Sequence, residues 1–191
     1  MEGLVLDRAL ATDGQMSRDE LAWLADRARE HRRIIELGSY RGRSTRALAD
    51  NTSGIVLAVD DWYGPRETTL DKHERATVAD DFRRNLADHL ASRRVQMVTW
   101  DHNQLDAMTL DGPPDMVFVD GDHSYPSTAY QCRWAIRQFP DGGFLCGHDV
   151  DRVEVQRAVD DVLGPHGGWF AGPGSLWWAR LVMQYGARPR G

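Results

Sequence analysis

This sequence of 191 residues has few cysteines, no long apolar run and no secretory signal pattern. Its two cysteines, Cys132 and Cys146, do not form a CxxC pair, and we expect both to be reduced, buried thiols. No stretch approaches the roughly 20 continuous apolar residues that a membrane helix requires, so we expect no membrane partner. Residues 1–11 lack a basic region followed by an apolar core, which predicts no secretory signal and a cytoplasmic protein.

Basic clusters are also missing. Lys and Arg number 23 against 29 Asp and Glu, a formal net charge of −6, and the arginines are scattered along the chain. This distribution offers no basic surface for a phosphate backbone, so nucleic acid is not an expected partner. The 41% hydrophobic and 27% charged fractions are ordinary for one globular domain of this length. We expect residues 1–186 to form that domain and residues 187–191 to be a frayed tail.

Short apolar runs alternate with amphipathic helical patterns along most of the chain. Five runs are typical of buried strands: residues 33–37, 55–59, 95–98, 116–119 and 143–146. A capping box formed by Ser17 and Glu20 predicts the start of a helix ahead of the first run. Asp151 and Glu154 predict a similar start after the last run. Strands alternating with helices indicate an α/β protein with a parallel, doubly wound sheet and helices on both faces.

The C-terminal part departs from this alternation. Residues 168–171 and 176–183 flank a Gly-Pro-Gly turn with no helix between them, which predicts a hairpin that adds an antiparallel strand to the sheet. Trp177 and Trp178 would point to opposite faces of this strand, one into the core and the other toward a subunit contact. A homodimer is therefore one expectation, because an edge strand with large apolar side chains invites pairing.

Ligands of a doubly wound sheet bind beyond the carboxyl ends of its strands. The first strand runs into Gly38-x-x-x-Gly42, which lacks the middle glycine of the G-x-G-x-x-G turn that binds a pyrophosphate. Glu36 would repel a pyrophosphate and would suit a cationic ligand with an amino group. Asp60 ends the second strand 22 residues after Gly38, where a carboxylate would hold a ribose diol. The pattern predicts a nucleoside ligand without phosphates.

These strand ends resemble a known class of enzymes. Glu36-x-Gly38-x-x-x-Gly42, Asp60 and, after the third strand, Asp101 are similar to class I S-adenosylmethionine-dependent methyltransferases, which have a Rossmann-like fold. The segments VDGDHSY (119–125) and GGFLCGHD (142–149) resemble methyltransferase family 24, a group similar to macrocin-type sugar O-methyltransferases and cephalosporin-hydroxylase-like proteins.

The resemblance implies S-adenosylmethionine as the cofactor. It implies that Gly38 and Gly42 approach the methionine moiety, that Asp60 binds the ribose hydroxyls, and that Asp101 and His102 face the adenine. Trp62 could stack against adenine or substrate, or anchor its loop. The predicted cofactor-binding residues are Glu36, Gly38, Ser39, Tyr40, Gly42, Ser44, Asp60, Trp62, Asp101, His102 and Asp120.

A second constellation gathers carboxylates and imidazoles at the ends of the fourth and fifth strands: Asp120, Asp122, His123, His148 and Asp149. Packed carboxylates repel one another unless a cation neutralises them or one of them holds a proton. In the sugar O-methyltransferases that the chain resembles, carboxylates at positions like Asp120 and Asp149 bind magnesium. This chain has His148 where a tandem acidic pair is expected, and imidazole favours softer ions such as zinc.

Three interpretations of the constellation remain open. It could be a metal centre for magnesium, manganese or zinc with Asp120, His148 and Asp149 as ligands. It could be a metal-free site in which His148 or His123 is the general base, because an imidazole titrates near neutral pH. It could also be structural turn chemistry. The predicted catalytic residues are Asp120, His123 and His148.

We expect an S-adenosylmethionine-dependent methyltransferase that transfers a methyl group to a hydroxyl of a small molecule such as a sugar, a catechol or a natural product. The polar segment 61–77 is long enough to form a lid over this acceptor. One alternative is a non-catalytic module that binds S-adenosylmethionine or a related nucleoside. A nicotinamide-dependent oxidoreductase is another, weakened by Glu36 and the missing middle glycine.

Overall fold

The computed structural model describes residues 3–64, 72–101 and 103–182. The predicted tail 187–191, His102 and positions 65–71 of the predicted lid lie outside these residues. The described strands are β1 (Arg33–Leu37), β2 (Ile55–Asp60), β3 (Val95–Thr99), β4 (Met116–Val119), β5 (Gly142–Gly147), β6 (Phe170–Ala171) and β7 (Trp177–Val182). The described α-helices are α1 (Asp7–Ala11), α2 (Arg18–Ala28), α3 (Arg43–Asn51), α4 (Lys72–Asn85), α5 (Ala87–Ala91), α6 (Tyr125–Arg137) and α7 (Val153–Leu163). None of these helices has the length and apolar character that crossing a membrane requires.

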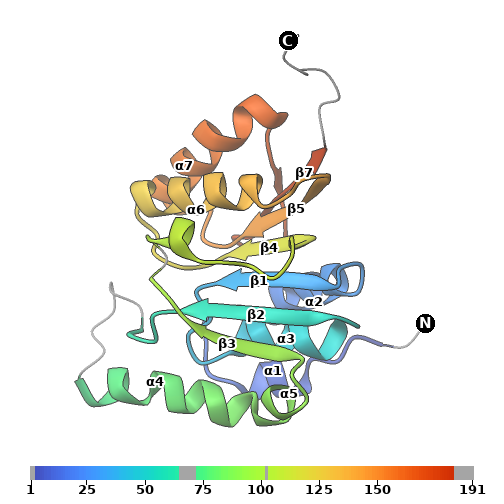
Figure 1. Cartoon of the computed structure of the whole chain (residues 1–191), viewed down its shortest axis with the longest axis vertical. Coiled ribbons are helices and arrows are strands. Elements are labelled where there is room, and N and C mark those ends of the chain that lie inside the picture. The colour runs from blue at the N-terminus through green and yellow to red at the C-terminus, as the bar shows by residue number, and fades with distance from the viewer. Residues whose placement is uncertain (1–2, 65–71, 102, 183–191) are drawn as a thin grey trace.

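All seven described strands belong to one sheet, in the order β3-β2-β1-β4-β5-β7-β6 (Figure 1). Strands β1 to β5 are parallel, whereas β7 pairs antiparallel with β5 and β6 pairs antiparallel with β7. The predicted sheet and its C-terminal hairpin are therefore confirmed. The strand order reverses between β1 and β4, so the loops that leave these two strands diverge and open a crevice between them.

Side chains of the central strands alternate between two apolar cores, one on each face of the sheet. On one face Ile34 and Phe118 pack with α1 to α4, and on the other Ile35 and Val117 pack with α6 and α7. Helices thus cover both faces, as the alternating pattern predicts (Figure 1). Cys132 and Cys146 are buried free thiols, in agreement with the expectation from their spacing.

The ends of the helices match the sequence signals only in part. At the start of α2, Ser17 Oγ accepts a hydrogen bond from Glu20 N, and Glu20 Oε2 accepts one from Ser17 N at 2.7 Å, so this capping box is confirmed. The capping box predicted for α7 is wrong, because its N-cap is Arg152 without a side-chain cap. Glu154 Oε2 instead accepts a hydrogen bond from Tyr125 N. The Glu154 carboxylate thus contacts the start of α6 instead of capping α7 as the local pattern predicted.

The two tryptophans of β7 point to opposite faces, as predicted. Trp177 is fully buried and its Nε1 donates to His148 O at 3.3 Å. Trp178 is partly exposed and stacks between Phe144 and Phe170, with ring centroids 5.7 and 4.7 Å away. Trp177 therefore fixes the loop after β5 against the hairpin, and a subunit contact at Trp178 stays a prediction.

We expect Trp177→Ala to lower the free energy of unfolding by about 3–5 kcal/mol, because it empties a fully buried site and removes the hydrogen bond to His148 O. The matched control is Phe170→Ala, since Phe170 is 57% exposed. It should cost less than about 1 kcal/mol. Urea unfolding followed by circular dichroism measures both, and equal losses would contradict the burial of Trp177 as the source of the effect.

Candidate functional site

A cavity of about 300 Å³ lies at the carboxyl ends of the parallel strands. Its described lining combines the turn after β1, the ends of β2, β4 and β5, and a segment ahead of α2. The predicted site residues that line it are Gly38, Ser39, Tyr40, Ser44, Asp60, Asp120, His123, His148 and Asp149. The structure therefore brings most of the two predicted constellations to one cavity.

The turn after β1 depends on its two glycines. Gly38 has φ +90°, and a Cβ at this position would lie 2.2 Å from the backbone oxygen of Asp120. Gly42 has φ +88°, and a Cβ there would lie 2.3 Å from a methyl carbon of Leu86. Both residues occupy the left-handed region that favours glycine. Gly38 lets the end of β4 approach the turn, and Gly42 lets Leu86, which lies between α4 and α5, pack against it.

Asp60 holds this turn in place from the end of β2. Its Oδ2 accepts hydrogen bonds from the backbone amides of Ser39 and Tyr40, both at 2.8 Å, and its Oδ1 accepts one from Trp62 N at 2.7 Å. The carboxylate is buried but borders the cavity. Three accepted bonds leave room for a further donor, because a carboxylate offers about four acceptor sites. A ribose hydroxyl at Asp60 is compatible with this geometry.

Glu36 lies one layer below the cavity and does not line it. Its Oε2 accepts hydrogen bonds from Ser39 Oγ, at 2.6 Å, and from Thr45 Oγ1, whereas its buried Oε1 has no hydrogen-bond partner among the described residues. Burial, with the nearby charge of Asp60, raises the pKa of Glu36 to about 7. A cationic group above the turn would stabilise its ionised form.

Besides Glu36, three of the described residues predicted for the cofactor do not line the cavity, namely Gly42, Trp62 and Asp101. Trp62 is buried, its Nε1 donates to Thr99 Oγ1 at 3.1 Å, and its ring lies 4.6 Å from that of Phe82. It anchors its loop, which was the alternative interpretation. Asp101 accepts a hydrogen bond from Asn103 N, and it is Asn103 that lines the cavity. Among the described residues of this loop, Asn103 lines the cavity, one position after the predicted pair of Asp101 and His102.

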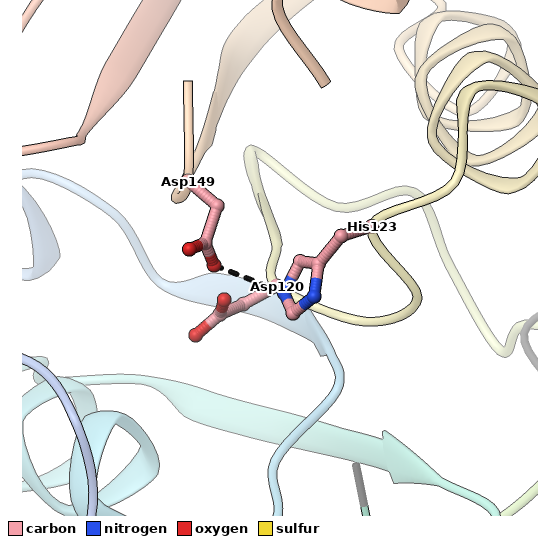
Figure 2. A group of neighbouring side chains, drawn as sticks. All are labelled: Asp120, His123 and Asp149. Atoms are coloured by element: carbon pink, nitrogen blue, oxygen red, sulfur yellow. Dashed lines mark ion pairs between the residues drawn. The ribbon is translucent and has the colours of Figure 1, made fainter. Parts of the chain in front are cut away.

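Asp120, His123 and Asp149 form a compact group at the ends of β4 and β5 (Figure 2). One ligand atom from each lies within 4.8 Å of the others, and His123 Nε2 is 2.9 Å from Asp149 Oδ2. Burial raises the pKa of Asp120 to about 7, and the charge of Asp149 adds to this shift against the opposing effect of His148. Burial alone would raise the pKa of Asp149, but hydrogen bonds from His123 and His148 outweigh it and hold that pKa well below its ordinary value.

His148 lies beside this group. Its Nδ1 lies 3.1 Å from Asp149 Oδ2, and its Nε2 lies 3.0 Å from both Glu20 Oε1 and Ser175 Oγ. Burial opposes its charge, yet Asp149, Asp120 and Glu20 together raise the pKa of His148 to about 9. Both ring nitrogens of His148 therefore lie within hydrogen-bonding distance of protein groups.

The predicted ligand set of Asp120, His148 and Asp149 differs from the group that the structure assembles, which contains His123 in place of His148. His148 contacts Asp149 beside this group, and its roles as metal ligand and general base stay predictions. The sequence could not show the contact of His148 with Glu20, because Glu20 is 128 residues away from His148.

The sequence analysis also missed part of the cavity wall. Gly14, Gln15 and Met16 line it from the segment between α1 and α2, and Arg152 lines it beside Asp149. Arg152 Nε donates to Asp149 Oδ1 at 2.9 Å. Arg152 follows the predicted site at the end of β5 closely enough to have been found. The segment ahead of α2 carries no strand-end pattern that would have marked it.

Comparisons with known proteins agree with this arrangement. A family model described as a methyltransferase domain matches residues 35–150. A search of curated proteins returned no significant match.

Solved structures of other proteins, O-methyltransferases among them, share the fold. An O-methyltransferase from Bacillus cereus, in complex with SAH, has 17% sequence identity and a TM-score of 0.64, with 91% of this chain and 86% of that chain covered. The O-methyltransferase TomG from Streptomyces achromogenes, involved in tomaymycin synthesis and in complex with SAM, has 19% identity and a TM-score of 0.63, with 88% and 81% covered. Cofactor-bound Rv0187 from MTB has 21% identity and a TM-score of 0.66, with 93% and 87% covered. At these identities the likeness shows the Rossmann-like fold.

We expect Gly38→Ala to lower the free energy of unfolding by more than about 1 kcal/mol, because a side chain at φ +90° is strained and would clash with the backbone of Asp120. The control is Gly164→Ala, where nothing lies within 4 Å of an added Cβ and φ is −49°. That variant should stay within about 0.5 kcal/mol of the parent protein. Urea unfolding compares the two, and a Gly38→Ala protein as stable as the control would refute the close approach.

Proposed function

The chain belongs to the family of methyltransferase domains, S-adenosylmethionine-dependent enzymes of class I, and on that premise we propose that it methylates a hydroxyl oxygen of a small molecule with the help of a divalent cation. This membership favours the methyltransferase interpretation over the nicotinamide-dependent oxidoreductase and the non-catalytic binding module. It leaves the acceptor, the atom methylated and the cation to be argued from the site.

One observation carries the proposal: the glycine turn and the cluster of Asp120, His123 and Asp149 border the same cavity. Asp120 links them directly, since its backbone oxygen lies against Gly38 while its carboxylate belongs to the cluster. A methyl donor seated on the turn would lie beside groups that can orient a hydroxyl and accept its proton. Alignment of donor and acceptor supplies much of the rate enhancement in such a transfer.

The turn fits S-adenosylmethionine better than a phosphate-bearing nucleotide. Glu36 beneath the turn has a buried oxygen with no hydrogen-bond partner among the described residues, and Asp60 retains acceptor capacity toward the cavity. Both features favour a ligand with positive charge and a ribose over one with phosphates. When bound, S-adenosylmethionine would supply the methyl group from its sulfonium. The backbone of Gly38 to Ser44 would bind its amino-acid and nucleoside parts.

The cluster fits a divalent cation. It offers two carboxylate oxygens and an imidazole nitrogen within 4.8 Å of one another, a donor set that suits manganese or zinc as well as magnesium. Arg152 Nε donates to Asp149 Oδ1, and His148 Nδ1 shares Asp149 Oδ2 with His123, so these contacts fix the carboxylate. A bound cation would lower the pKa of an acceptor hydroxyl. We propose that one of the three side chains of this cluster accepts the proton that leaves the hydroxyl.

The charge of the cavity points to a neutral acceptor. Five aspartates line it: Asp60, Asp61, Asp120, Asp122 and Asp149. Arg43 and Arg152 also line it and keep their positive charge while donating to backbone carbonyls and to Asp149. The carboxylates outnumber these guanidinium groups, which disfavours an anionic acceptor before a cation is bound. A neutral vicinal diol, such as a catechol or a sugar, fits the cavity and the cation.

We expect Asp149→Asn to weaken Mn²⁺ binding at least about tenfold, because it removes a charged ligand of the cluster. The matched control is Asp151→Asn, an exposed aspartate outside the cavity lining, which should leave Mn²⁺ binding unchanged. Calorimetric titration of chelator-treated protein measures both. Equal Mn²⁺ affinity in the two variants would remove the cation from the proposal.

We expect methyl transfer from radiolabelled S-adenosylmethionine to catechol, lost after chelation and restored by Mg²⁺ or Mn²⁺. A carboxylated catechol should be a poorer acceptor, since its negative charge meets the acidic lining. An aromatic amine of the same size tests the nitrogen alternative. Label found in the amine but in neither diol would overturn the assignment of oxygen as the methylated atom.

A further inference from the structure

Residues 12–16, which connect α1 to α2, form a wall of the cavity that belongs to neither predicted constellation. Gly14, Gln15 and Met16 line the cavity opposite the strand ends. Met16 is buried, whereas Gln15 is exposed. We call this segment the arm. Short connecting segments keep a defined conformation only where other parts of the chain hold their backbone groups.

One side chain holds the backbone of the arm. Arg43, the first residue of α3, donates from Nε to Met16 O at 3.0 Å and from Nη1 to Leu10 O at 3.1 Å and Thr12 O at 2.5 Å. A Cβ on Gly14 would lie 2.7 Å from Arg43 Cδ, so the arm rests on the stem of this side chain. Arg43 therefore binds both ends of the arm and packs against its middle.

The same turn supplies a second fastening. Arg41 forms ion pairs with Asp13 of the arm and with Asp81 of α4, the latter at 3.1 Å. Arg41 and Arg43 flank Gly42 in the turn after β1. Residues of this turn line the cavity, and its two arginine side chains hold the arm. Directly after the arm, the capping box of α2 positions Glu20 against His148 at 3.0 Å. The arm thus connects the glycine turn with the segment that contacts His148, next to the cluster of Asp120, His123 and Asp149.

We propose that the arm completes the cavity for S-adenosylmethionine and that Arg43 is a positioning residue, which acts on the cofactor by fastening the arm to the glycine turn. The inference rests on the proposed function, since it takes this cavity as the cofactor site. Because one turn contacts both the cofactor and the arm, binding of the cofactor and ordering of the arm are thermodynamically linked. Each then stabilises the other by the same free energy.

A structural role alone would give a different result, and the chain offers a matched control for it. Arg94 likewise donates from Nη1 to two backbone carbonyls, Thr52 O at 2.6 Å and Gly54 O at 3.3 Å. Thr52 and Gly54 precede β2, and Arg94 precedes β3. These hydrogen bonds therefore lie at the amino ends of the strands, whereas the cavity lies at their carboxyl ends. Arg94→Met removes a comparable set of hydrogen bonds without touching the arm.

The test combines calorimetry with hydrogen–deuterium exchange on the full chain, using S-adenosylmethionine as the probe. In the parent protein the ligand should slow amide exchange in residues 12–16. Arg43→Met should raise the Kd for S-adenosylmethionine about tenfold and abolish this ligand-dependent protection. Arg43→Lys, which keeps the charge but cannot reach three carbonyls, should give an intermediate Kd. Arg94→Met should lower the melting temperature and leave the Kd unchanged.

The outcomes separate the inference from the proposed function. No binding of S-adenosylmethionine to the folded parent protein would overturn the proposed function and the inference with it. Binding by the parent with an unchanged Kd in Arg43→Met would overturn the inference alone. A raised Kd with normal protection of residues 12–16 would also overturn it, since Arg43 would then act by direct contact. If Arg43→Met does not fold, Arg43→Lys decides by the same two readouts.

Discussion

The contact between Gly38 and the backbone of Asp120 is the constraint on which the site depends. A side-chain carbon at position 38 would lie 2.2 Å from the Asp120 oxygen, so the turn after β1 and the end of β4 meet without space between them. These two strands are neighbours at the point where the strand order reverses. Their contact brings a turn suited to a nucleoside and a cluster suited to a hydroxyl acceptor into one cavity. The hydrogen bonds from Ser39 and Tyr40 to Asp60 then fix the turn from the other side.

The charges around Asp120, His123 and Asp149 form one connected network. Asp149 Oδ2 faces both His123 Nε2 and His148 Nδ1, and Arg152 donates to the other oxygen of Asp149. His148 Nδ1 also lies 3.8 Å from Asp120 Oδ1. His148 is in turn held by Glu20, whose carboxylate also caps α2. His148 stands where the family resemblance implies an acidic residue, and it contacts both Asp149 and Glu20. In the proposed cation site, His123 would be the third donor.

Much of the fold could be predicted from the sequence, because its signals are local. Apolar runs such as residues 33–37 and 116–119 mark buried strands, and the pair Ser17 and Glu20 marks a helix start. The apolar residues Val78, Phe82, Leu86 and Leu90 are spaced by four and so favour one helix, yet the segment is divided at Leu86 into α4 and α5. The short helix α1 has no signal strong enough to find it.

The site could be predicted as far as strand ends define it. Asp120 and Asp149 lie where the parallel topology places them, and so do Gly38 and Asp60. The failures have a common cause, which is contact between distant segments. Glu20 contacts His148 although the two residues are 128 positions apart in the sequence. The indole of Trp62 donates a hydrogen bond to Thr99 and does not line the cavity. No spacing in the sequence reports such contacts.

A crystal structure with S-adenosylhomocysteine and Mn²⁺, with anomalous data collected at the manganese edge, tests most directly whether the turn and the cluster form one reaction site. We predict the nucleoside along the glycine turn with its ribose at Asp60, its sulfur facing the cluster, and one anomalous peak between Asp120, His123 and Asp149. A nucleoside bound elsewhere would contradict the account, and so would a manganese ion held by His148 instead of His123.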